Sequence, residues 1–219
     1  MTNMAIFTTW VVASCISPEL LGYGLHRLLH SGAIGFLSRN HMKHHLVLYG
    51  PLQAQRSNEY RDASDHSFSL GNVGLEWLIP AALLRVCALG VFRLLHLRSL
   101  YQLIYFVATL GWSFLMFSYL HDVQHIDGYW MERNRWLKGW FVSARSRHEI
   151  HHHAINDQGL MDRNFGIGFF FFDRLFGTLC SVEPAFNDTG YKMAQARFSD
   201  DSLARRAPNF GVHRQKGSR

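Results

Sequence analysis

Apolar positions along the chain fall into three long stretches that are separated by polar segments. Residues 1–25 carry one charged side chain, Glu19, and residues 99–120 carry none. Between them, residues 77–97 are apolar apart from two arginines. A helix of about 20 apolar residues crosses the hydrocarbon core of a bilayer. The pattern therefore predicts three membrane-spanning helices, at roughly 4–25, 76–96 and 99–120, with a tight turn near His96–Ser99.

The distribution of Lys and Arg predicts how these helices are oriented. Residues 26–75 hold five of the 22 basic side chains, and residues 121–219 hold fourteen. The positive-inside rule makes both segments cytoplasmic. The first apolar stretch has no basic residue before it, which argues against a cleaved signal peptide and for a retained span. The positive net charge of +6 is thus explained by topology, and no nucleic-acid partner is expected.

Composition narrows the class of protein further. Hydrophobic residues make up 48% of the 219 residues and charged residues 17%, which excludes an intrinsically disordered chain. Three cysteines without a C-x-x-C pair exclude a disulfide framework and a thiolate metal site. We expect one membrane domain over residues 1–198, followed by a polar, basic and flexible tail over residues 199–219.

Histidine is the residue type that points to chemistry. Of 14 histidines, ten fall into four groups with spacings of three or four residues, which place side chains on one face of a helix. These groups are His26 and His30; His41, His44 and His45; His121 and His125; and His148, His151 and His152. Four others, His66, His96, His153 and His213, are expected to be ordinary histidines. Because a zinc ion takes three or four protein ligands, ten imidazoles predict two metals. Imidazole suits iron, copper, nickel and zinc, so ligand type alone does not choose among them.

The order of the four groups, H-x3-H, H-x2-H-H, H-x3-H and H-x2-H-H, resembles that of the membrane fatty acid hydroxylase and sterol desaturase superfamily. The segments Asn164–Gly166 and Phe172–Thr178 are similar to the family's N-[YF]-G and W-D-R-L-F-G-T stretches, with Phe172 in place of Trp. The resemblance extends from about Gly24 to Thr178. It implies an all-α integral membrane protein with three to four transmembrane helices and a cytoplasmic helical cap that carries the histidine boxes.

The same resemblance implies the activity. The ten clustered histidines would bind two iron ions, with no catalytic residue beyond these ligands and with O2 as co-substrate. The protein would be a non-haem lipid hydroxylase or desaturase that acts on a fatty acyl chain, a sterol, a carotenoid or an alkyl lipid. The chain has no G-x-G-x-x-G fingerprint and no cysteine motif for an iron–sulfur cluster. We therefore expect a separate electron donor, such as a cytochrome b5, a ferredoxin or a reductase.

Two alternatives come from other classes of protein. His148-Glu149-x-x-His152 satisfies the H-E-x-x-H pattern of zinc metalloproteases, with Glu149 as general base. A haem-binding electron carrier could use His30 and His125 as axial ligands. In the hydroxylase interpretation, Glu149 instead accepts a hydrogen bond from a ligand imidazole.

Two charged residues lie well inside the predicted spans, and they give a further expectation. An ionised side chain at the centre of a bilayer is costly and is usually paired. Glu19 and Arg85 are therefore expected to pair between the first and second spans.

Overall fold

Helices form almost the whole of the computed structural model, which describes residues 3–56, 69–70 and 73–198. A hairpin of two short antiparallel strands pairs Ser69 with Gly74 and Leu70 with Val73. The elements are α1 (Asn3–Ser31), α2 (Gly35–Lys43), the π-helix η1 (His44–Leu48), β1 (Ser69–Leu70), β2 (Val73–Gly74), α4 (Leu75–Leu94), α5 (Ser99–Ser113), the π-helix η2 (Phe114–Leu120), α6 (His121–Val123), the 3-10 helix η3 (Trp130–Glu132), α7 (Lys138–His153), α8 (Phe171–Leu175) and α9 (Asp188–Phe198).

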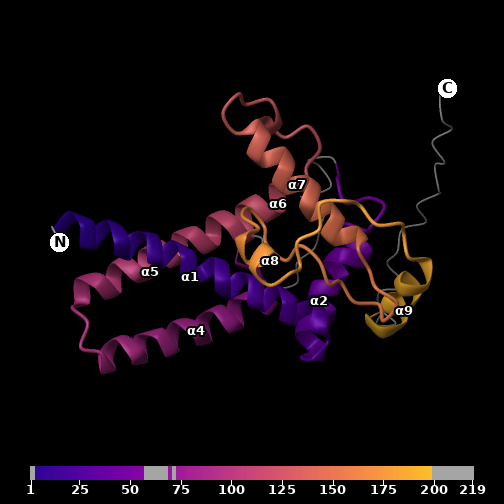
Figure 1. Ribbon diagram of the computed structural model, residues 1–219. Coiled ribbons are helices and arrows are strands. Elements are labelled where there is room, and N and C mark those ends of the chain that lie inside the picture. The colour runs from indigo at the N-terminus through magenta and orange to yellow at the C-terminus, as the bar shows by residue number, and fades with distance from the viewer. Residues whose placement is uncertain (1–2, 57–68, 71–72, 199–219) are drawn as a thin grey trace.

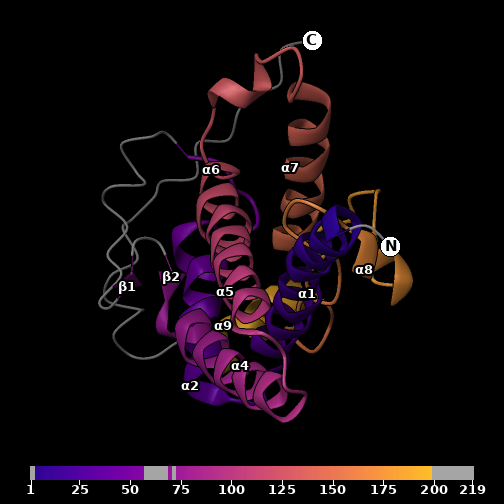
Figure 2. The same ribbon diagram turned by 90° about the vertical axis from the view of Figure 1, so that its left-hand side faces the viewer.

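Three long helices, α1, α4 and α5, run side by side and project away from the other elements (Figure 1). The closest pair is α1 with α5, which share the most extensive contact between two elements. Viewed nearly along their axes, the three helices form a bundle, with α1 to the right of α5 and α4 below α5 (Figure 2). The segments Met4–Ser31 and Ser99–Val123 are long and apolar enough to cross a membrane, with mean hydropathies of 1.5 and 1.7.

Helices occupy all three predicted ranges, 4–25, 76–96 and 99–120, and α1 is longer than expected. It continues through His26 and His30 to Ser31, so both histidines belong to the same helix as the apolar stretch. Pro18 lies inside α1 and cannot donate a backbone hydrogen bond to the carbonyl of Ser14. The hydroxyl of Ser17 donates to that carbonyl instead, at 3.3 Å, which helps to keep the helix continuous.

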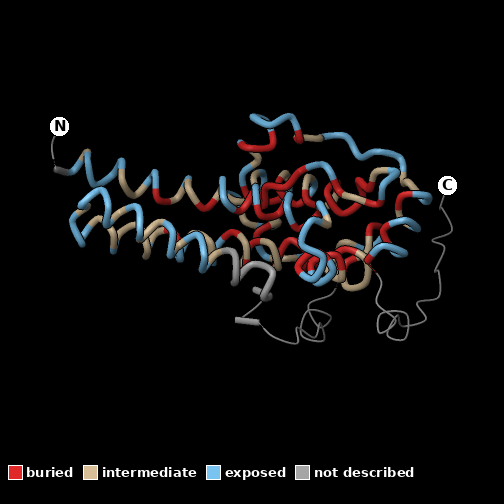
Figure 3. Tube along the Cα trace, turned by 90° about the horizontal axis from the view of Figure 1, so that it is seen from below, coloured by how far each residue is buried: buried red, intermediate tan, exposed pale blue. Residues whose placement is uncertain are grey.

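Burial distinguishes the two ends of the molecule. Buried residues are concentrated where α2, η1, α7 and the loops around α8 meet, whereas the projecting helices are largely half-buried or exposed (Figure 3). Phe141, Phe165 and Ile167 are at most 2% exposed at the buried end. Leu83, Val107 and Leu110 are exposed on the projecting helices.

The predicted pair between Glu19 and Arg85 is wrong. The indole Nε1 of Trp112 donates to Glu19 Oε1 at 2.6 Å, and Arg85 Nη2 donates to the hydroxyl of Ser113 at 3.3 Å. Each charged side chain therefore bonds to α5 and not to the other. For Glu19 the reason is packing, because α1 contacts α5 far more extensively than it contacts α4.

The predicted tail, residues 199–219, lies outside the described residues. The last described element, α9, ends at Phe198. Asp188 and Lys192 on its exposed first turn form an i,i+4 ion pair. Ala194 and Phe198 are buried against Met42 of α2, so α9 belongs to the buried end of the molecule.

Candidate metal centre

Four segments bring the clustered histidines to one place at the buried end of the helical bundle. Eight of the ten rings are at most 2% exposed, and His44 and His121 are half-buried. The segments are α1, the α2–η1 junction, α6 with the residue two positions beyond it, and the last two turns of α7. All ten histidines predicted from the sequence belong to one connected cluster of rings, His26, His30, His41, His44, His45, His121, His125, His148, His151 and His152.

The first half of the cluster is built around His30. The ring nitrogens of His26, His30, His41 and His45 include one from each residue that lie within 4.8 Å of one another. His151 approaches from α7, with its Nε2 3.0 Å from Nε2 of His30. The His41 Nε2 atom lies 3.1 Å from the same atom of His30. Several imidazole nitrogens therefore point at one small volume.

The second half of the cluster is built around His125. Ligand atoms of His44, His121, His125 and His148 lie within 4.8 Å of one another, and the Nε2 atoms of His125 and His148 are 3.1 Å apart. A further group joins His152 to His44 and His45. His45 thus belongs to the first half of the cluster, and its neighbour in η1, His44, belongs to the second.

The π-helical turn η1 contributes to this division. His44 and His45 are consecutive and begin η1 directly after α2. π-Helical turns are rare and frequently occur at functional sites. A second π-helical segment, η2, ends at Leu120, immediately before His121. Both irregular segments therefore lie next to histidines of the cluster.

Backbone carbonyls fix the proton on four of the rings. The Nδ1–H groups of His26 and His151 donate to the carbonyls of Phe165 and Arg163, at 2.7 and 2.6 Å. The remaining two donate in the same way, His125 to Ala54 at 2.6 Å and His152 to Tyr49 at 2.8 Å. Because a carbonyl oxygen only accepts, Nδ1 carries the proton and Nε2 of each neutral ring presents a lone pair.

The lone pairs are arranged as a bound cation requires. The Nε2 atoms of His44 and His152 are buried and have no hydrogen-bond partner among the residues that the structure describes. The unprotonated Nε2 atom of His151 lies 3.0 Å from Nε2 of His30. A divalent cation between such nitrogens would satisfy them, and imidazole is a good ligand for iron. Within the described residues no carboxylate oxygen joins any of these clusters.

Burial also keeps these rings neutral, as metal binding requires. It lowers the pKa of His125 to about 4. For the others outside the long apolar helices, burial lowers the pKa well below the usual value for histidine, with repulsion between neighbouring imidazolium groups as a second cause. These are His41, His44, His45, His148, His151 and His152.

A buried carboxylate holds the loop that supplies two of the carbonyls. Asp173 is fully buried and accepts hydrogen bonds from the backbone N–H groups of Phe165 and Gly166, at 2.7 and 2.8 Å. It also accepts from the hydroxyl of Thr178 at 2.8 Å. A Cβ on Gly166 would lie 2.5 Å from the carbonyl oxygen of Phe169, so the close turn needs glycine.

The neighbouring Asn164 closes the same loop. Its backbone is left-handed, with φ of 53°. The side-chain amide donates to the carbonyls of Arg147 and Cys180, and its oxygen accepts from the N–H of Cys180 at 2.7 Å. The supporting carbonyls were missed from the sequence because every residue type has one. The N-F-G and D-R-L-F-G-T segments were the available signal for this loop.

Glu149 does not take its predicted position. It accepts a hydrogen bond from the side-chain amide of Gln55, and none from a ligand imidazole within the described residues. The reason is helical geometry: His148, His151 and His152 share the face of α7 that meets the cluster, and Glu149 faces a separate polar depression with Glu183 and His153. Burial raises the pKa of Glu149.

An apolar groove lies beside the cluster, between α1, α4 and the α5–η2 segment. It has a volume of about 190 Å³. Leu25, which lines it, directly precedes His26 in α1. The residues that define it here are Pro18, Leu21, Leu25, Leu84, Phe114 and Phe117.

Comparison with known proteins gives the family. Residues 11–178, which include all ten clustered histidines, match the model of the family described as fatty acid hydroxylase. The chain belongs to the fatty acid hydroxylase family. No curated protein and no solved structure matches the chain.

Membership of the fatty acid hydroxylase family confirms the resemblance predicted from the histidine boxes, and it implies an oxidoreductase. It does not favour the zinc protease, and neither does Glu149, whose carboxylate bonds to Gln55 and faces the polar depression instead of the histidine cluster. The haem alternative placed His30 and His125 on opposite faces of a porphyrin. Each of them has another imidazole nitrogen at about 3 Å, which leaves no room for that ring.

The histidines expected to be ordinary are outside the cluster where they can be described. His96 is exposed in the turn between α4 and α5. His153 contacts the carboxylate of Glu183 at 3.4 Å. His66 and His213 lie outside the described residues.

Proposed function

We propose that the ten clustered histidines bind two iron ions and that the protein uses O2 to oxidise a C–H bond of a membrane lipid. The observation that carries this proposal is the convergence of buried imidazole nitrogens on one site, together with an apolar groove that includes Leu25, the residue before His26 in α1. Iron held by imidazole nitrogens would supply redox chemistry, and the groove suits an apolar chain. Family membership supports the lipid substrate.

The cluster divides between the two ions in a way that its geometry suggests. One ion would be bound by His26, His30, His41, His45 and His151. The other would be bound by His44, His121, His125, His148 and His152. When bound, such a pair of irons supplies the reduction of O2 and the oxidation of an unactivated C–H bond.

The protein itself would orient the ligands and present the substrate. The carbonyls of Phe165, Arg163, Ala54 and Tyr49 hold four imidazoles with Nε2 directed inward. The groove would exclude water from the lipid chain and place one carbon near the level of His26. No further catalytic residue is proposed. Electrons would come from a separate protein, such as a cytochrome b5, a ferredoxin or a reductase.

The position of the histidines suggests how the protein lies in the membrane. We propose that α1, α4 and the α5–η2 segment cross the bilayer, so that the protein is multi-pass. The histidine cluster and the C-terminal region would lie on the cytoplasmic face, in a helical cap formed by α2, η1 and α7. Supporting this arrangement are the two long apolar segments and the concentration of Lys and Arg on one side.

Lipid profiling under ¹⁸O₂ tests the proposed activity. Cells that express the protein should accumulate a lipid alcohol that carries the label if the reaction is hydroxylation. A product lighter by two hydrogens and unlabelled would indicate desaturation. Cells that express the His151→Ala variant provide the matched control, because the variant lacks one proposed ligand. Identical lipid profiles for the wild type and this variant would contradict the proposal.

A further inference from the structure

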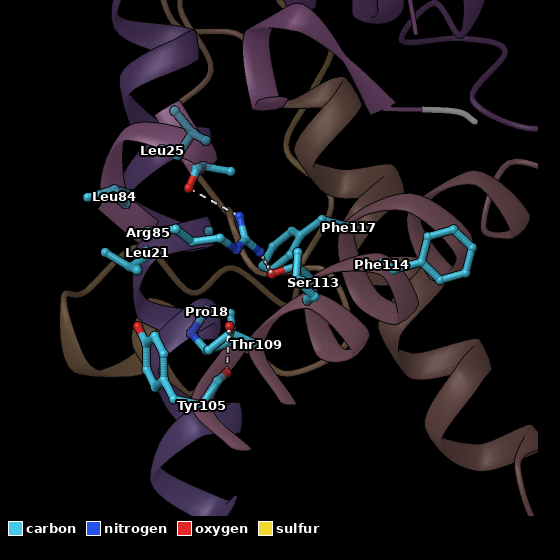
Figure 4. A pocket seen from close by; sticks show the side chains of 13 residues that line it. Pro18, Leu21, Leu25, Leu84, Arg85, Tyr105, Thr109, Ser113, Phe114 and Phe117 are labelled. Carbon is cyan, nitrogen blue, oxygen red and sulfur yellow. Dashed lines mark hydrogen bonds between the residues drawn. The ribbon is translucent and has the colours of Figure 1, made fainter. Parts of the chain in front are cut away.

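Arg85 is a charged side chain in the wall of the apolar groove. It projects from α4 across the groove toward Ser113, with Leu25 and Leu21 along the neighbouring wall (Figure 4). A charged side chain at the centre of a membrane helix costs about 2.5–3.5 kcal/mol on insertion scales, so it normally has a partner or a function. The expected partner, Glu19, instead accepts a hydrogen bond from Trp112.

The other polar groups of the groove bond within the protein. The hydroxyl of Thr109 donates to the carbonyl of Tyr105 at 2.7 Å. The phenol of Tyr105 contacts the hydroxyl of Ser17 at 3.5 Å. The hydroxyl of Ser113 accepts from Arg85.

Arg85 differs from these groups because most of its donors are unused. A guanidinium has five N–H groups. Arg85 makes two hydrogen bonds within the described residues, to the carbonyl of Ala81 at 3.1 Å and to Ser113 at 3.3 Å. Its Nε atom is buried and has no hydrogen-bond partner. No carboxylate within the described residues forms an ion pair with it. Within the described residues, the groove therefore holds a positive charge with more donors than acceptors.

We propose that Arg85 selects a lipid that already carries an oxygen acceptor, such as a hydroxyl, a carbonyl or a carboxylate. This inference deepens the proposed function and rests on it. A charged donor forms stronger hydrogen bonds than a neutral one, and more so where water is excluded. A purely hydrocarbon chain would fill the groove but leave the guanidinium unsatisfied.

The position of Arg85 also sets a distance. Its partner Ser113 precedes His121 by eight residues along the α5–η2 segment, which corresponds to about two helical turns. The oxygen atom bound at Arg85 would therefore lie about two turns below the level of His121. The substrate would be oxidised at a carbon remote from its existing oxygen, and the oxygen would fix the position of the chain.

Binding of three radiolabelled probes of equal chain length tests this inference. The purified protein in detergent is titrated with hexadecane, 1-hexadecanol and hexadecanoate. We expect the wild type to bind at least one of the two oxygen-bearing probes tenfold or more tightly than hexadecane. In Arg85→Met this preference should fall below twofold. Arg93→Met makes the same substitution at an exposed position of α4 outside the groove, and it should keep the wild-type preference.

The two oxygen-bearing probes distinguish the chemistry at Arg85. Tighter binding of hexadecanoate than of 1-hexadecanol indicates a carboxylate, and the reverse order indicates a neutral oxygen. Equal affinity of the wild type for all three probes would overturn the inference, as would a preference that survives in Arg85→Met. If Arg85→Met does not fold, Arg85→Gln takes its place, and the same loss of preference is expected because the charged donor is again removed.

The measurement is independent of turnover. A wild-type protein that binds two irons but shows no probe preference would contradict the role of Arg85 and leave the proposed function standing. A wild-type protein that shows the preference but binds no iron would contradict the proposed function and leave the role of Arg85 standing.

Discussion

The two ends of the molecule hold their structure in different ways. On the projecting helices, large apolar side chains such as Leu83 and Val107 are exposed. At the histidine end, even charged and polar side chains such as Asp173 and Asn164 are completely buried and fully hydrogen-bonded. An exposed apolar surface is favourable where lipid surrounds it, whereas buried polar groups must be satisfied within the protein. The difference indicates that one end is built for lipid and the other for holding ligands in fixed orientations.

The largest expected effect comes from removing a proposed ligand that lies between the two halves of the histidine cluster. His45 lies in the first cluster and also in the group that joins it to His44 and His152. His45→Ala should reduce the oxidation of lipid by at least about 100-fold and lower the iron content, since even supporting residues of a metal site contribute 10- to 100-fold. His153→Ala, on the same end of the molecule, is the control. Equal iron content in the two variants would exclude His45 as a ligand.

A charge introduced on the exposed surface of the projecting helices tests whether that surface faces lipid. Val107 on α5 and Val182 beyond the cluster are 63% and 78% exposed. Val107→Arg should disfavour membrane insertion by about 2.5–3.5 kcal/mol, because that position would face lipid. Val182→Arg should change stability by less than about 0.5 kcal/mol. Insertion can be followed with a glycosylation reporter. Similar effects of the two substitutions would mean that α5 faces water.

Asp173 tests whether the buried loop at the histidine end orients the proposed metal ligands. Asp173→Asn replaces an acceptor of two backbone N–H groups with an amide that can accept through one atom only. We expect iron affinity to fall about 10- to 100-fold, because the carbonyls that orient His26 and His151 belong to the same loop. Asp162→Asn, at an exposed position of the same loop between α7 and α8, should leave iron affinity unchanged. Iron titration of both variants gives the answer, and unchanged affinity in Asp173→Asn would show that the loop does not orient the ligands.

The smallest effect is expected at Glu149. Glu149→Gln should alter lipid oxidation by no more than about threefold, because the side chain bonds to Gln55 and joins no ligand cluster. A zinc protease would lose its general base and all activity. Complete loss of activity with zinc still bound would favour the protease.

Sequence reasoning succeeded where one periodic pattern determines the structure. Helical spacing predicted that His26 and His30 share a face, and apolar runs predicted α1, α4 and α5. It failed where the answer depends on which elements pack together. Glu19 and Arg85 were expected to pair because both lie well inside predicted spans, but α5 supplies a hydrogen-bond partner to each. Glu149 shows the same limit, because adjacent residues on a helix point about 100° apart. Backbone carbonyls such as that of Phe165 leave no mark in a sequence.

Metal analysis of the purified protein, combined with its visible spectrum, tests the central claim most directly. Ten converging imidazoles in two groups predict about two iron ions per chain and no Soret band. The same measurement on His45→Ala should give a clearly lower iron content. One zinc ion per chain, a Soret band, or iron retained in full by the variant would contradict the account.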